Sequence, residues 1–81
     1  MTLPAFREKL VNKILCAPSQ YHAGRIVDAA FKALHKHKVN GHLVARFIEK
    51  TTRQLDEYAS AHPDSQQAEN ISAALLKFRD R

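Results

Sequence analysis

The chain has 81 residues, 44% of them hydrophobic, and a formal net charge of +5. This length holds one hydrophobic core, and the composition is too apolar for a disordered chain, so the sequence predicts a single helical domain over residues 1–81. One cysteine excludes an intramolecular disulfide and a cysteine-based zinc finger, and no apolar run approaches the roughly 20 residues that span a bilayer. We therefore expect a soluble, cytoplasmic protein without membrane association.

Capping residues and apolar spacing predict two helices in the first half of the chain, about residues 3–16 and 20–37. The first begins after Thr2, which is the expected N-cap, and carries Pro4 in its first turn. Ser19 is the expected N-cap of the second. The apolar and charged residues of the second helix separate onto opposite sides, as in a helix that lies on a core.

Two further helices are predicted, about residues 41–60 and 65–79. Asn40 is the expected cap of the third helix, which should bury an apolar face that includes Leu43. Asp64, followed three residues later by Gln67, resembles a capping box for the fourth. The short connections favour antiparallel neighbours. The sequence thus predicts an all-α, up-and-down bundle of about four helices, in which the second and third form an αα-hairpin.

The basic residues are concentrated in the first two thirds of the chain. Residues 9–54 contain nine Lys or Arg and two acidic residues, whereas residues 55–81 contain three basic and five acidic residues. Helical spacing places several of these cations on the solvent sides of the second and third helices. If the two helices lie side by side, their basic faces form one positive surface. Its predicted residues are Arg25, Lys32, Lys36, Lys38, His42, Arg46, Lys50 and Arg53.

Such a surface predicts a non-enzymatic binding module for a negatively charged partner, either nucleic acid or an acidic protein. Its cations would contact phosphates or carboxylates without base specificity. The simplest alternative is that charged solvent faces only keep the protein soluble. A DNA-binding helix-turn-helix over residues 20–60 is less favoured, because that motif needs a short first helix and both helices here run to about 18 to 20 residues.

No catalytic residue, metal ligand or cofactor is predicted, since the sequence has no Gly-rich loop, paired-carboxylate motif or ordered nucleophile and base. Cys16 is expected to be a small buried residue. His35 and His37 point to nearly opposite sides of one helix, which disfavours a metal site. His37 is instead expected to hydrogen-bond the last carbonyls of its helix.

The main alternative function is a helical self-assembly or adaptor protein that uses apolar contacts. Leu76 projects away from the apolar seam of the fourth helix, and Phe31 lies at the edge of the apolar arc of the second. If exposed, these side chains would form a patch for a homodimer. Salt distinguishes the two hypotheses, because polyanion binding weakens steeply as salt rises and an apolar interface survives.

Overall fold

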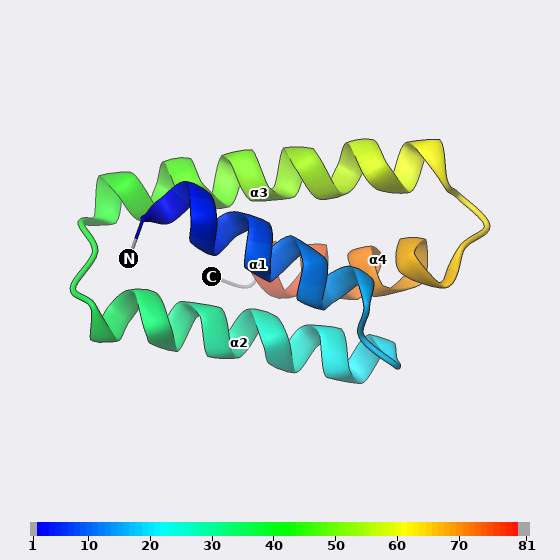
Figure 1. The fold of residues 1–81 in the computed structure, drawn as a ribbon, viewed down its shortest axis with the longest axis horizontal. Coiled ribbons are helices and arrows are strands. Elements are labelled where there is room, and N and C mark those ends of the chain that lie inside the picture. The colour runs from blue at the N-terminus through cyan, green and yellow to red at the C-terminus, as the bar shows by residue number, and fades with distance from the viewer. Residues whose placement is uncertain (1, 80–81) are drawn as a thin grey trace.

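The computed structural model describes residues 2–79, which form four helices (Figure 1). They are α1 (Leu3–Leu15), α2 (Gln20–Lys36), α3 (Gly41–Ala61) and α4 (Gln66–Arg79). The described part of the chain contains no strand, so the predicted all-α fold is confirmed. The observed ends of the helices differ from the predicted ends by at most one residue.

The helices alternate in direction along the bundle, but α2 and α3 are not neighbours. α1 and α4 occupy the middle, and α2 and α3 flank them on opposite sides (Figure 1). α4 packs on the three other helices, whereas α2 and α3 barely touch. The predicted αα-hairpin of α2 and α3 is therefore wrong. Residues 37–40 carry the chain from one flank of the bundle to the other.

Small residues explain the close packing of α2 on α4. Ala23 and Ala74 are fully buried. A Cβ on Gly24 would lie 3.1 Å from Cε of Lys77, so the side chain of Lys77 on α4 lies over Gly24. The ammonium group of Lys77 lies 3.4 Å from a carboxylate oxygen of Asp28 and joins the same two helices. Because small side chains allow short distances between helix axes, α2 is fixed against α4 and away from α3.

Every helix contributes to one apolar core. Ile14, Val27, Leu55 and Ile71, one from each helix, are fully buried. Burying an aliphatic side chain of this size stabilises the folded state by about 1.5–3 kcal/mol relative to leaving it exposed. Burial shared by all four helices is what holds them in one bundle.

One buried polar side chain ties α4 to the end of α1. Asn70 is fully buried, and its Nδ2 donates to the carbonyl oxygens of Ile14 at 3.1 Å and Ala17 at 2.8 Å. Its Oδ1 accepts a hydrogen bond from Nε2 of Gln66 at 3.2 Å. The last carbonyls of a helix lack intrahelical partners. Asn70 thus supplies donors to the segment in which α1 ends.

Side chains cap three of the helices. Those of Ser19 and Asn40 accept hydrogen bonds from backbone N–H groups in the first turns of α2 and α3, as predicted. Thr2 stands at the N-cap of α1, but its side chain makes no capping bond. The predicted capping box at Asp64 is wrong, because α4 begins one residue later. Oγ of Ser65 accepts from a backbone N–H of α4 at 3.2 Å instead.

α2 ends in a left-handed turn at Lys38, whose φ is 53°. The N–H of Lys38 donates to the His35 carbonyl at 3.0 Å, and the N–H of Val39 donates to the Leu34 carbonyl at 3.2 Å. This pair of bonds is the Schellman motif, which satisfies the last carbonyls of a helix. His37 is exposed, and backbone N–H groups take the part that the sequence predicted for its side chain.

Candidate functional site

All eight residues of the predicted basic surface are exposed, but they lie on two separated helices and the turn between them. The α2 set consists of Arg25, Lys32 and Lys36. The α3 set consists of His42, Arg46, Lys50 and Arg53. Lys38 lies in the connecting turn. Since α2 and α3 flank the bundle on opposite sides, the condition for one continuous surface is not met, and the α2 and α3 sets form two separate basic faces (Figure 1).

The structure brings a cation from α1 to the α3 set. A groove of about 250 Å³ between α1 and α3 is lined by Leu3, Pro4, Arg7, Leu43, Arg46, Phe47 and Lys50. A more open hollow of about 360 Å³ is lined by Arg7, Lys50, Arg53, Gln54 and Glu57. Two residues line both, so the hollow continues the groove. We call the four cations along this path the α1–α3 basic face; they are Arg7, Arg46, Lys50 and Arg53.

Most of the positive charge on the α1–α3 basic face is not neutralised by the protein. Arg53 lies 3.4 Å from Glu49, but both side chains are about 70% exposed, so this pair is weak. The other three cations make no ion pair with any described residue. No carboxylate lines the groove, and Glu57 lies only in the adjoining hollow. The face therefore attracts anions.

Arg7 is the least solvated cation of the face. Its side chain is half-buried, and its Nε is buried without a hydrogen-bond partner among residues 2–79. An unpaired buried donor costs about 1–3 kcal/mol, and low local dielectric strengthens any charge interaction that such a group makes. The stacked rings of Phe6 and Phe47, 5.6 Å apart, hold α1 against α3 and so fix the position of Arg7.

The sequence did not predict Arg7 as a site residue, because the negative charge of the next residue, Glu8, cancels its positive charge when charges are summed along the chain. Consecutive residues are about 100° apart around a helix, and Glu8 is exposed and lines neither the groove nor the hollow. A signal was nonetheless present. Arg7 lies four residues after Leu3 and four before Val11, within the apolar stripe of its helix. A cation in that register faces a neighbouring helix.

Leu43 is 47% exposed, although the sequence predicted that it is buried. It stands in the first turn of α3 and lines the same groove as Leu3, at which α1 begins. At this end of the groove, α1 contributes Leu3 and Pro4 to the lining. An apolar side chain is thereby left accessible among the cations of the groove.

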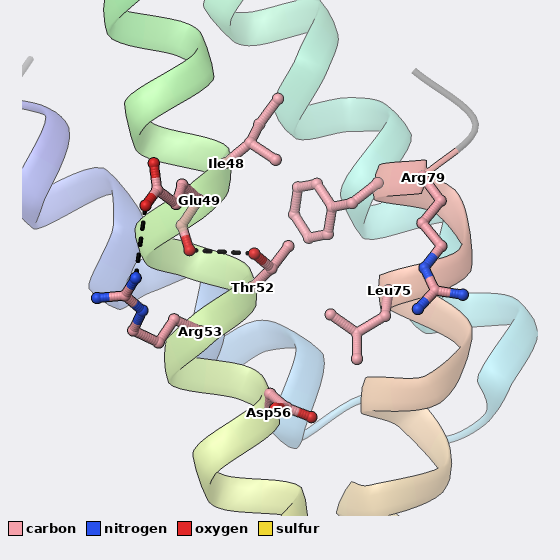
Figure 2. Close-up of a pocket in the computed structure, with 8 residues that line it drawn as sticks. Ile48, Glu49, Thr52, Arg53, Asp56, Leu75 and Arg79 are labelled. Carbon is pink, nitrogen blue, oxygen red and sulfur yellow. Dashed lines mark hydrogen bonds and ion pairs between the residues drawn. The ribbon is translucent and has the colours of Figure 1, made fainter.

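A larger groove of about 570 Å³ lies between α3 and α4 (Figure 2). Ile48, Leu75 and Phe78 supply its apolar lining. Its acidic side chains are Glu49 and Asp56, and its basic ones are Arg53 and Arg79. Thr52 is engaged, since its hydroxyl donates to the Glu49 carbonyl at 3.0 Å. With two charges of each sign, this groove has no net attraction for a polyanion.

Another hollow, of about 490 Å³, lies between α2 and α4 and bears on the predicted self-association patch. Leu76 and Tyr21 line it and are 60% and 74% exposed. The guanidinium of Arg25 lies 5.9 Å from the centre of the Tyr21 ring. Phe31 is only half-exposed, and its ring packs edge-on against Phe78 at 5.6 Å. Of the two predicted patch residues, Leu76 alone is well exposed.

Cys16 is exposed, contrary to prediction, because α1 ends at Leu15 and Cys16 lies at the C-cap beyond the buried stripe. His35 and His42 are also exposed. Within residues 2–79, no three His, Cys, Asp or Glu side chains converge in a way that would hold a metal ion.

None of the described helices combines the length and the apolar character needed to cross a membrane. Comparison with known proteins identifies no relative. The sequence matches no protein-family profile, and neither a curated protein nor a solved structure shows significant similarity to it. The α1–α3 basic face is thus the feature from which a function is best inferred.

Proposed function

We propose that the chain is a non-enzymatic binding module whose α1–α3 basic face engages a negatively charged macromolecule in the cytoplasm. The observation that carries the proposal is a groove lined by three cations and no carboxylate. Anions bound there would pair with side chains that have no ionic partner among the described residues. Arg presents a planar fork of donors that suits both phosphate and carboxylate groups.

The spacing of the cations supports contact with several charges at once. Arg46 and Lys50 are four residues apart and Arg53 follows three residues later, which places them about 6 Å and about 4.5 Å apart along the axis of α3. Arg7 adds a cation from α1 beside them. A polyanion that lies along this path releases counterions at each contact, so its affinity depends on salt. The α2 set, on the other flank, takes no part in binding and maintains solubility.

Two matched double variants test the proposal. Arg46→Glu with Lys50→Glu, and Lys32→Glu with Lys36→Glu, each reverse two exposed cations four residues apart on one helix and change the net charge equally. Circular dichroism checks that both variants fold. Binding to a fluorescein-labelled duplex DNA and to fluorescein-labelled polyglutamate is then measured by anisotropy over a range of salt concentrations.

With about four cations engaged, the slope of log affinity against log salt on duplex DNA should be about −3.6 for the unmodified protein. The α3 variant should flatten this slope by about 2 and lower the affinity for both probes more than about tenfold. The α2 variant should change the affinity less than about threefold, through net charge alone. Equal losses in the two variants, or a larger loss in the α2 variant, would overturn the proposal.

A second function, self-assembly through the hollow between α2 and α4, is favoured by the exposed Leu76 and Tyr21. Exposed apolar residues that adjoin one another are typical of protein contacts. An apolar dimer should persist at high salt in sedimentation experiments and dissociate on Leu76→Glu. A monomer at every salt concentration would reject this function.

A further inference from the structure

We propose that the partner is an acidic, amphipathic protein helix that places an apolar side chain in the groove between α1 and α3 and sets carboxylates on its cations. This inference depends on the proposed function and names the class of partner for the same face. It rests on the apolar part of the groove, on the placement of the cations around that part, and on the surroundings of the aromatic rings.

The apolar part of the groove is formed by Leu3, Pro4, Leu43 and Phe47. Leu43 is 47% exposed and lies among cations. The cations keep the protein soluble, but an exposed leucine does not contribute to solubility. The groove volume of about 250 Å³ is smaller than the roughly 300–1,000 Å³ of pockets for drug-sized molecules. A space of this size suits one or two apolar side chains from a partner.

The cations surround the same space. Arg7 approaches from α1 and Arg46 and Lys50 from α3, and all three line the groove together with Leu43. An apolar side chain bound there would have positive charges on both sides. Carboxylates that flank this side chain on a helical segment would pair with those charges. The required pattern is that of an amphipathic helix with acidic residues beside its apolar anchors, the helix-in-groove mode of recognition.

Nucleic acid fits the charges but not the apolar part of the groove. Proteins that bind single strands stack bases on accessible aromatic rings. The one ring that lines this groove, Phe47, is stacked on Phe6 at 5.6 Å and is only 4% exposed. A duplex would contact the cations through its phosphates and leave Leu43 without a partner. The face is therefore better matched to an acidic protein segment.

Glu57 determines at which end of the α1–α3 basic face the acidic residues of the partner should lie. It lines the far hollow with Arg53 and Gln54 and is absent from the groove that contains Leu43. Glu57 makes that far end less attractive to carboxylates than the groove, which no acidic residue lines. The acidic residues of the partner should therefore cluster around the apolar anchor, at the Leu43 end of the face.

The test uses three labelled probes and two matched variants. The first probe is a helical peptide with Leu at positions i, i+3, i+4 and i+7 and Glu beside them; the second has Gln at each Leu position; the third is duplex DNA. Leu43→Gln removes the exposed leucine of the groove without changing the charge. Leu76→Gln makes the same change at an exposed leucine between α2 and α4 and is the control. Lys50→Glu reports on the basic face itself.

The Leu peptide should bind more tightly than the Gln peptide, and Leu43→Gln should lower its affinity about tenfold while leaving DNA binding unchanged. Leu76→Gln should have no effect, and Lys50→Glu should weaken all three probes. Equal binding of the two peptides, an unaffected Leu peptide in Leu43→Gln, or tighter binding of DNA than of the Leu peptide would overturn this inference and leave the basic face in place. A Lys50→Glu variant that binds every probe normally would instead refute the proposed function.

Discussion

Replacing Asn70 by alanine should remove a large part of the free energy of unfolding. The substitution removes the donor that serves the carbonyl oxygens of Ile14 and Ala17. The Ile14 carbonyl keeps the N–H of Ala17 as a partner at 3.2 Å, whereas the Ala17 carbonyl loses its side-chain donor. An unpaired buried polar group costs about 1–3 kcal/mol. With the packing lost around a fully buried side chain, we expect a loss of about 2–4 kcal/mol in the free energy of unfolding.

This loss is large for a chain of this size, whose total stability should be about 4–12 kcal/mol. Urea unfolding, followed by circular dichroism, measures it through the midpoint and slope of the transition. Ser72→Ala is the control, because Ser72 is an exposed residue of the same helix. It should cost less than about 0.5 kcal/mol. A similarly small loss in Asn70→Ala would refute the structural part assigned to its two hydrogen bonds.

Three further substitutions test local features by the same unfolding assay. Ser65→Ala should lower the free energy of unfolding by about 1 kcal/mol because Ser65 caps α4, whereas Asp64→Ala should be nearly neutral. A larger loss in Asp64→Ala than in Ser65→Ala would instead support the capping box at Asp64 that the sequence predicted. Lys38→Gly should stabilise the protein by about 1 kcal/mol, since glycine adopts the positive φ without strain, and a loss of stability would contradict the left-handed turn. Gly24→Ala should stabilise α2 by up to about 1 kcal/mol, because only the flexible end of Lys77 must move; a loss above about 1 kcal/mol would mean that α2 and α4 cannot separate even slightly.

The features that the sequence predicted well are local ones. The side chains of Ser19 and Asn40 accept hydrogen bonds from backbone N–H groups only two or three residues away, so their capping can be predicted from the sequence. Helical phase is equally local, and it correctly predicted that all eight residues of the basic surface are exposed to solvent. The packing order of the helices is not local. It depends on contacts between α2 and α4 that bury small residues such as Ala23 and Ala74, and alanines of this kind look like ordinary helical residues in the sequence.

The candidate site shows the same division. Arg46 and Lys50 were identified from their spacing on one helix, but their association with Arg7 requires the packing of α1 on α3. In a sum of charges along the chain, Glu8 cancels Arg7, although the two side chains point in different directions from the helix. The exposure of Leu43 likewise depends on where α1 begins relative to α3. Contacts between helices, rather than patterns within them, create the groove.

The most direct test of the α1–α3 basic face is a map of backbone amide chemical shifts by NMR during titration with the acidic Leu peptide. We predict that the largest shifts occur at Arg7 and Leu43 and at the neighbouring cations Arg46 and Lys50. The amides of Lys32 and Lys36 on α2 should remain unchanged at saturation. Larger shifts on α2 than on α1 and α3, or small shifts spread evenly over all four helices, would contradict the assignment of this face as the binding site.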